Sequence, residues 1–296
     1  MSIDIVDWLD GNLISMVDGV AYGLLLFTLA VGLSLIFGMM DVLNLAHGTL
    51  YLAGAYVAYA LADGTWIGLL VAVVVGLAVG AVGGGVLAAL TQPLATRGHL
   101  DQALLTLGIA FIAADILATV FGGDVLPITP PGGLQGSISI LGHAYPTYRL
   151  AFIAVAGVLA GVAYLLFERS SLGALVRATV ADRDMVRASG VDTRKLMAGV
   201  FAFGAALATI GGVLGAPIIP PGPGVDETVL VLSLVVVVVG GLGSVPGALL
   251  GALLIGQVQT LGVALTPAYA PFLLFGAMLA VLAWRPAGLV SLVRRG

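Results

Sequence analysis

The chain has 296 residues, of which 60% are hydrophobic and 9% are charged, and its net charge is −4. A soluble domain has about 25% charged residues, so this composition excludes a water-soluble protein and predicts one that resides in a lipid bilayer. The absence of cysteine excludes disulfides and thiolate metal sites.

The N-terminal segment Met1–Asp10 is acidic, whereas a secretory signal peptide begins with a basic region. Residues 3–17 contain apolar side chains able to face lipid, which predicts an interfacial amphipathic segment. A frayed terminus explains the same residues equally well.

Apolar segments long enough to cross a membrane follow along the whole chain. A spanning helix needs roughly 20 apolar residues for about 30 Å of hydrocarbon, and open sheet edges go unsatisfied in lipid. The expected fold is all-α and polytopic, one helical bundle of about nine spans (range eight to ten) in a single domain over 1–296. The spans are expected at 20–40, 42–62, 67–90, 102–121, 149–167, 197–219, 228–243, 247–266 and 271–284.

A polar cluster, Asp41-Val-Leu-Asn-Leu-Ala-His-Gly-Thr49, separates the first two spans. At helical spacing Asn44 and His47 share a face, and polar groups at membrane depth usually face the bundle interior or a water-filled path. We therefore expect Asn44, His47 and Thr49 to line a translocation path. A tight inner turn whose polar atoms cap helix ends is the alternative.

The fourth span contains a carboxylate, Asp115, and an ionisable group inside a membrane is a functional hypothesis by default. Gln102 and Thr106 precede it by about four and two helical turns, which would form a polar stripe. Thr106 and Asp115 are therefore further candidates for the path. Pairing of Asp115 with a helix end, or its protonation, is the alternative.

The segment Glu168–Lys195 carries ten of the 26 charged residues, six of them basic. A basic island between spans predicts a cytoplasmic loop. With nine spans and the N-terminus outside, ten of the eleven Lys and Arg residues lie inside, and Arg149 lies at an outer border. We therefore expect a multi-pass protein of the cell membrane whose 168–196 loop and C-terminus are cytoplasmic.

Residue inventory excludes several activities. A phosphate-binding P-loop needs Gly-Lys-Ser/Thr, but the only lysine, Lys195, follows Arg194. His47, His99 and His143 show no metal-ligand spacing. We expect no catalytic residues, cofactor or metal, and no ATP hydrolysis by this chain.

Three consecutive motifs point to a known family: Gly32-Leu-Ser-Leu-Ile-Phe-Gly38, Val42-Leu-Asn-Leu-Ala-His-Gly48 and Leu52-Ala-Gly-Ala-Tyr56. They resemble the LivH-type membrane permeases of branched-chain amino-acid ABC importers, with Ser34 and Leu45 as conservative departures. Later blocks agree, and the resemblance covers about residues 20–285. These blocks are Leu172-Gly-Ala-Leu-Val-Arg-Ala178, Ala188-Ser-Gly-Val-Asp192 and Val239-Gly-Gly-Leu-Gly-Ser-Val-Pro-Gly247.

The resemblance implies the transmembrane subunit of a binding-protein-dependent importer. Its implied partners are a second permease, two ATP-binding subunits, an external substrate-binding protein and membrane lipid, and no nucleic acid. It also implies that 173–192 is a cytoplasmic coupling segment that docks on the ATPase, where mixed charges suit a polar interface. The residues expected there are Arg177, Asp182, Arg183, Asp184, Arg187 and Gly190, the last as the C-cap of a short helix.

Small residues four apart recur in the spans, as in Gly76–Gly84, Gly157–Gly161, Gly211–Gly215 and Gly247–Gly251. They allow close helix packing, within this chain or against the second permease.

Other functions remain open at this point. Relatives of the family handle urea, short amides and other amino acids, and the pore-lining candidates do not define a site for a zwitterion. An ion-coupled secondary transporter would need inverted repeats and a buried ionisable cluster, whereas only Asp115 is available. An intramembrane enzyme would need a nucleophile and a base in proximity, and no such pair is evident.

Overall fold

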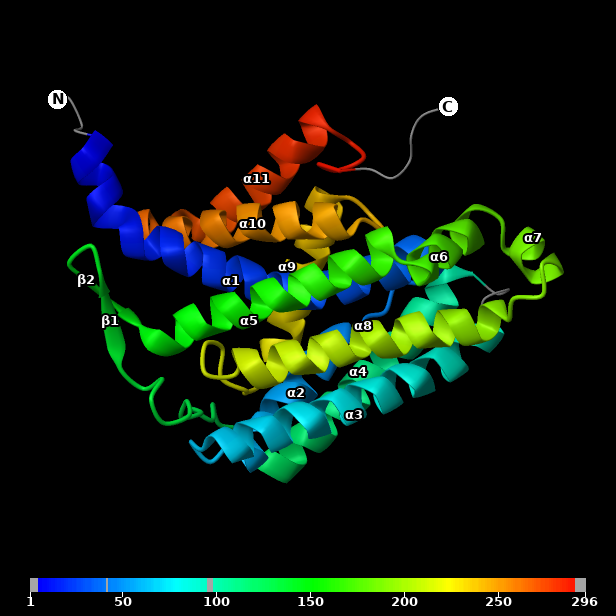
Figure 1. Cartoon of the computed structure of the whole chain (residues 1–296), viewed down its shortest axis with the longest axis horizontal. Helices are drawn as coiled ribbons and strands as arrows, with labels where there is room; N and C mark the ends of the chain where they lie inside the picture. The colour runs from blue at the N-terminus through cyan, green and yellow to red at the C-terminus, as the bar shows by residue number, and fades with distance from the viewer. Residues whose placement is uncertain (1–4, 41, 95–97, 291–296) are drawn as a thin grey trace.

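The computed structural model describes residues 5–40, 42–94 and 98–290, which form a helical bundle with one small hairpin (Figure 1). The helices of the described residues are α1 (Ile5–Met40), α2 (His47–Leu61), α3 (Trp66–Thr91), α4 (His99–Phe121), α5 (Thr147–Tyr164), α6 (Ser171–Ala181), α7 (Arg183–Ala188), α8 (Thr193–Gly215), α9 (Val225–Gly240), α10 (Val245–Leu265) and α11 (Ala270–Trp284). Strands β1 (Ser137–Ile140) and β2 (His143–Pro146) pair antiparallel. Residues 5–17, expected as a separate segment or a frayed end, are the first turns of α1.

Seven helical segments of the described residues are long and apolar enough to cross a bilayer, so the chain is an all-α polytopic membrane protein. These segments are Asp10–Gly38, Trp66–Leu94, His99–Phe121, Thr147–Arg169, Thr193–Gly215, Val245–Leu265 and Pro267–Trp284. The expected count of about nine is not confirmed.

The difference lies in α2 and α9, which have 15 and 16 residues. At 1.5 Å per residue each is about 22–24 Å long, which is less than the ~30 Å of hydrocarbon. Residues 42–46, which the sequence assigns to the second span, precede the helix, and the Asn44 side chain forms a turn among them. Gly241, with a φ of 102°, follows the last residue of α9.

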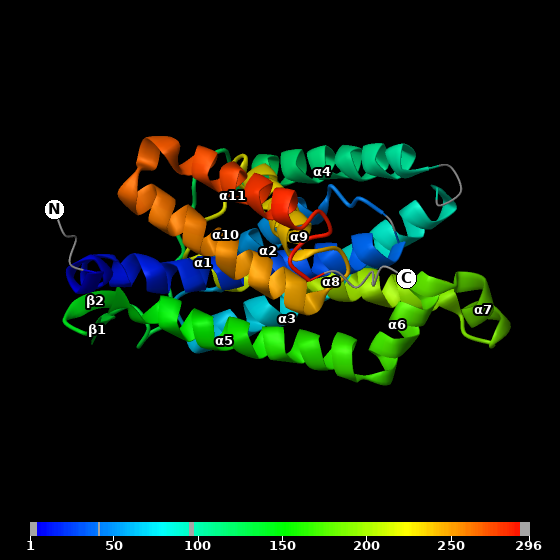
Figure 2. The ribbon, with the colours of Figure 1, turned by 90° about the horizontal axis from the view of Figure 1, so that it is seen from above.

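The longest helix, α1, is the centre of the bundle. Of its apolar window 83% is buried, against 11% for α4 and for α11. Helices α10, α8, α9 and α5 pack around α1, and α2 and α9 lie at the middle of both views (Figures 1 and 2). The outer helices expose large apolar side chains, such as Leu70 and Val82 on α3, as expected for contact with lipid.

Three of the four glycine motifs pack within this chain, and in the third, Gly211 and Gly215 of α8 lie against Thr28 and Leu25 of α1. A Cβ on Gly80 would lie 2.6 Å from Cα of Ala206 on α8, and a Cβ on Gly84 would lie 2.6 Å from the carbonyl oxygen of Phe201. Gly251 meets α9 at Gly240 in the same way. By contrast, a Cβ on Gly157 or Gly161 of α5 would meet nothing within 4 Å among the described residues.

The two ends of the bundle differ in what they carry. The β1–β2 hairpin lies beside the start of α1 at one end, and α6 and α7 project at the other (Figures 1 and 2). Leu289 and Val290 pack on the end of α9 through hydrogen bonds to Val239 and Gly240, near the place where α1 ends. Three of the expected inner basic residues, Arg97, Arg294 and Arg295, lie outside the described residues.

Candidate functional site

The turn before α2 is built by Asn44. Its side-chain Oδ1 accepts a hydrogen bond from the backbone N–H of Ala46 at 3.1 Å, and its carbonyl accepts one from His47 N–H at 3.3 Å. An Asn side chain that bonds the backbone two residues ahead mimics a turn and competes with helix. Asn44 therefore forms a turn directly before α2, whose N-cap residue, Ala46, has no side-chain cap.

His47, the first residue of α2, is fully buried. Its Nε2 lies 3.0 Å from the carbonyl oxygen of Leu29 on α1. Because a carbonyl oxygen only accepts, Nε2 is the protonated nitrogen in this contact. The bond joins the start of α2 to a point well inside α1.

Two polar atoms in this turn are buried without a partner among the described residues, Nδ2 of Asn44 and Nδ1 of His47. Buried polar atoms in proteins are almost always hydrogen-bonded. These two atoms, on residues three apart in sequence, are free to bond water or a polar solute.

Thr106 on α4 joins the same cluster. Its Oγ1 accepts from the backbone N–H of Leu45 at 3.1 Å and lies within donating distance of the carbonyl of Leu43, at 3.2 Å. The side chain is fully buried. Thr106 thus attaches α4 to the turn before α2.

Thr49 reaches a residue that sequence reasoning missed. Its Oγ1 donates to Oδ2 of Asp226 at 3.4 Å, and Asp226 lies in the first turn of α9 with 8% of its surface exposed. A carboxylate is stabilised at a helix N-terminus. A Cβ on Gly48 would collide with the backbone of Asp226, so the N-termini of α2 and α9 meet inside the bundle. An acidic residue at the start of an apolar run is the signal that indicates such a position.

Asp115 does not join this cluster within the chain. It is exposed on α4, whereas Gln102 and Thr106 are buried. The predicted polar stripe was wrong because nine residues separate Thr106 from Asp115, which is two and a half turns and places them on opposite faces.

The segment between α5 and α8 is ordered by side-chain caps. Asp182 Oδ1 accepts from Met185 N–H at 2.9 Å and begins α7. Gly190, with a φ of 85°, follows the end of α7 at the position where the sequence predicts a helix-ending glycine. Asp192 accepts from the N–H groups of Arg194 and Lys195 and begins α8.

The charged side chains of this segment differ in exposure. Asp182, Asp184 and Arg187 are exposed and Arg183 is half-buried. Arg177 instead turns back to the end of α5, where it donates to the carbonyl of Phe167 and lies 3.7 Å from the Glu168 carboxylate. Met185 of α7 is 70% exposed, so the surface of α7 combines this apolar side chain with the exposed charges.

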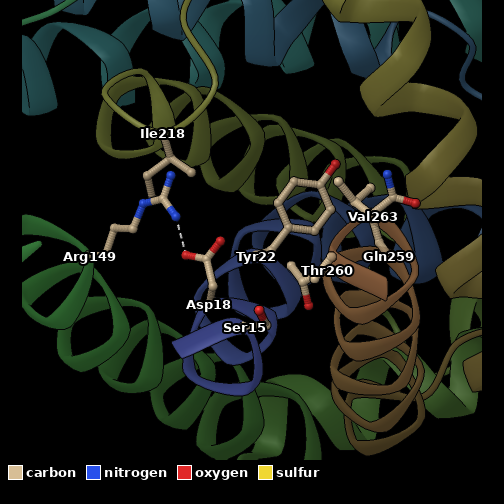
Figure 3. Close-up of a pocket in the computed structure, with 9 residues that line it drawn as sticks. Ser15, Asp18, Tyr22, Arg149, Ile218, Gln259, Thr260 and Val263 are labelled. Carbon is tan, nitrogen blue, oxygen red and sulfur yellow. Dashed lines mark hydrogen bonds and ion pairs between the residues drawn. The ribbon is translucent and has the colours of Figure 1, made fainter. Parts of the chain in front are cut away.

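A cavity of about 380 Å³ lies near the hairpin end of the bundle, between α1, α5, α10 and the residues after α8 (Figure 3). Arg149 of α5 and Asp18 of α1 form an ion pair on its wall. The hydroxyl of Tyr145 donates to the same Asp18 oxygen at 3.2 Å. Burial and the nearby Asp18 raise the pKa of Tyr145 above its ordinary range, so the hydroxyl keeps its proton.

Sequence reasoning placed Arg149 at an outer border and missed Asp18. No local pattern joins residues 131 positions apart. The one available signal was Arg149 itself, the basic residue left on the outer side.

Residues 15–282 match the family described as the permease component of branched-chain amino acid transport systems. The chain is 27% identical over 290 residues to the high-affinity branched-chain amino acid transport system permease protein BraD of Pseudomonas aeruginosa, covering 93% of this chain and 94% of the relative. It is 27% identical over 294 residues to the LivH permease protein of Escherichia coli, with 93% and 94% covered. The LivM permease protein of Escherichia coli is 27% identical over 310 residues, covering 94% of this chain and 70% of LivM. No solved structure matches the chain.

Proposed function

The chain belongs to the family of permease components of branched-chain amino acid transport systems, and from this premise we propose that it carries branched-chain amino acids through the cell membrane as one subunit of a binding-protein-dependent ABC importer. It is a transport protein and not an enzyme. The family match over 15–282, on a chain with seven apolar helices, is the observation that carries the proposal.

The partners are a second permease, two ATP-binding subunits and an external substrate-binding protein. Similarity to both LivH and LivM of Escherichia coli supports pairing with a related but different permease. The small-residue face of α5 at Gly157 and Gly161, which packs on nothing within the described chain, leaves room for a close helix neighbour.

The α6–α7 segment is the contact with the ATP-binding subunits. Its support is position and composition: it projects at one end of the bundle (Figure 2) and exposes Asp184, Met185 and Arg187 together. Basic residues concentrate in and near this segment, which favours the cytoplasmic side for it and for the C-terminus.

We assign α2 and α9 to two further crossings that are completed by non-helical chain, which gives nine. Broken or short helices with buried irregular backbone are tolerated at membrane depth where they line a cavity or path. The buried turn at 42–46 before α2 fits this description.

The translocation path passes the place where α2 and α9 begin. Asn44 and His47 supply unpartnered polar atoms there, and Thr49 and Thr106 supply hydroxyls. Asp115 belongs to the same path if α4 faces the second permease, because its carboxylate is exposed on the side of α4 away from Thr106. A permease for urea, amides or other amino acids is the alternative that shares this architecture.

Reconstitution in liposomes tests the proposal. The complete assembly should import leucine when ATP and the binding protein are supplied. The chain alone should take up nothing in response to a proton or sodium gradient, because the proposed importer is driven by its ATP-binding subunits. Uptake by the lone chain driven by such a gradient would favour a secondary transporter. Uptake of urea but not leucine by the complete assembly would favour the related importers.

A further inference from the structure

The cavity near the hairpin end of the bundle has a charged wall made by two helices. Asp18 and Arg149 have side chains that are 29% and 32% exposed, and both point toward the open space that Figure 3 shows. Asp18 lies about two turns inside the candidate membrane-spanning segment Asp10–Gly38 of α1. Charged groups at such positions are rare and usually serve a function.

The ion pair has binding capacity beyond its own contact. The observed bonds use Nη1 of Arg149 and Oδ1 of Asp18, the latter shared with the Tyr145 hydroxyl. A guanidinium has five N–H donors and a carboxylate has two oxygens. A ligand can therefore bond to both residues without breaking the link between α1 and α5.

The rest of the cavity is of a different kind. Ile218, Val263 and Ala264 form an apolar part of the lining, and Ser15, Tyr22, Gln259 and Thr260 add polar groups. Its volume of about 380 Å³ falls within the roughly 300–1,000 Å³ of small-molecule sites. A small molecule with a charged head and an aliphatic tail matches this division.

Charge balance selects the head group. In an α-amino acid the ammonium and the carboxylate are attached to one carbon, so adjacent groups of opposite charge can hold both. A zwitterion adds no net charge to the site. A free amine or a free acid would leave one charge without a partner in a partly buried place, which is costly.

We propose that this cavity is a binding site for a zwitterionic aliphatic amino acid, whose ammonium binds Asp18 and whose carboxylate binds Arg149, with the aliphatic side chain against Ile218 and Val263. The site rests on the proposed function. It lies at the end of the bundle opposite α6 and α7, so in an importer it would be the first place where substrate meets this chain. Tyr145 holds the Asp18 carboxylate in position.

The test measures equilibrium binding of radiolabelled leucine to the purified permease assembly without its binding protein. Leucinamide, which lacks the carboxylate, and 4-methylpentanoate, which lacks the ammonium, serve as competitors. Asp18→Asn and Arg149→Gln should each weaken leucine binding about 10-fold or more, because a hydrogen bond to a charged group contributes roughly 1.5–3 kcal/mol. Asp18→Asn should selectively reduce discrimination against 4-methylpentanoate, and Arg149→Gln should selectively reduce discrimination against leucinamide.

The nearby pair of Asp10 and His143, joined at 3.3 Å and not among the cavity residues, provides the matched control. Asp10→Asn and His143→Gln should leave leucine binding within twofold. The double variant Asp18→Asn/Arg149→Gln keeps a pair of hydrogen-bonding amides and should remain folded while binding leucine weakly.

Three results would overturn the site: no leucine binding by the unmodified assembly, unchanged affinity in the double variant, or unchanged analogue discrimination in the single variants. The last would mean that the ion pair only links α1 to α5. ATP-driven uptake by the unmodified assembly is measured in parallel. Uptake with unaffected binding in the variants would reject the site alone, whereas binding without ATP-driven uptake would reject the importer and leave the site.

Discussion

Thr49 on α2 donates a hydrogen bond to the carboxylate of Asp226 on α9, across 3.4 Å and 177 residues of sequence. Both residues are buried in the first turn of a short helix. The contact joins the two helices that are too short to cross the membrane unaided. It also supplies a hydrogen-bond donor to the buried carboxylate of Asp226.

Replacing Thr49 with valine should destabilise the protein, because a buried carboxylate loses a hydrogen-bond partner. The expected cost is about 1–3 kcal/mol, seen as a lower midpoint of thermal unfolding in detergent. Thr228→Val is the matched control, since Thr228 is exposed and its hydroxyl bonds to Gly224 at the start of its own helix. Equal losses in the two variants would contradict a role for the link between α2 and α9.

Replacing His47 with alanine should lower ATP-driven uptake while the ATP-binding subunits still co-purify. The variant loses the bond to Leu29 that positions the start of α2. His47→Gln, which keeps an N–H donor, should recover part of the uptake. Uptake assays on the reconstituted assembly give both values.

A cysteine at position 47 tests access to the path, since the chain has none of its own. It is buried in the present conformation, so it should react with a small water-soluble thiol reagent only in another transport state. Absence of reaction in every state would place the path elsewhere.

Reversing two charges on α7, with Arg183→Glu and Arg187→Glu together, should uncouple ATP hydrolysis from uptake while the protein still inserts. Breaking charged pairs at an interface typically costs about 2–5 kcal/mol. Arg194→Glu with Lys195→Glu is the matched double reversal, in the exposed first turn of α8, where acidic residues are tolerated. Uptake per ATP hydrolysed separates the two variants, and normal coupling in the α7 variant would rule out docking there.

Adjacent glycines on α3 should respond oppositely to alanine. A Cβ on Gly84 would lie 2.6 Å from the backbone oxygen of Phe201, so Gly84→Ala must push α3 away from α8. A Cβ on Gly85 meets nothing within 4 Å among the described residues, so Gly85→Ala should be neutral or stabilising by up to about 1 kcal/mol through helix propensity. Thermal unfolding of the two variants measures the difference, and a tolerated Gly84→Ala would argue against this close packing.

Asp192 should make stability depend on pH. The backbone hydrogen bond from Lys195 is the largest cause that lowers the pKa of its carboxyl. A lowered folded pKa stabilises the folded state above the unfolded value of about 3.9. This contribution is lost as pH falls through the lower folded pKa.

The unfolding midpoint of the native chain should therefore exceed that of Asp192→Asn near neutral pH. The two midpoints should converge as the pH falls below about 4. Asp124→Asn, at an exposed loop position, is the control. A difference that persists unchanged into acid would assign the effect to something other than ionisation of Asp192.

Features that depend on near neighbours were predictable from the sequence. Gly190 was recognisable as a helix-ending glycine because the residues before it form a short helix of their own, and Gly80 was recognisable as a packing residue from the repeat of small residues four apart. The all-α membrane fold and the family followed from composition and from motifs of contiguous residues.

Features that depend on distant residues were not predictable. The partners of Thr49 and Arg149 are 177 and 131 residues away, so only the folded chain shows that Asp226 and Asp18 contact them. The length of α2 also escaped prediction, because residues 42–46 are mostly apolar, although the Asn44 side chain forms a turn among them. Asp115 was grouped with Thr106 because their spacing is about two helical turns, although half a turn of phase puts them on opposite sides of α4.

The contact between α2 and α9 can form only late in synthesis of the chain. Chains leave the ribosome N-terminus first, so His47 finds Leu29 as soon as α2 follows α1. Thr49, in contrast, has no carboxylate to bond until α9 emerges, after every helix up to α8 has been synthesised. A chain truncated before residue 225 should therefore lack the partner of Thr49, although α2 can still pack on α3 and α8. The middle of this permease is therefore completed late, after most of its periphery has been inserted.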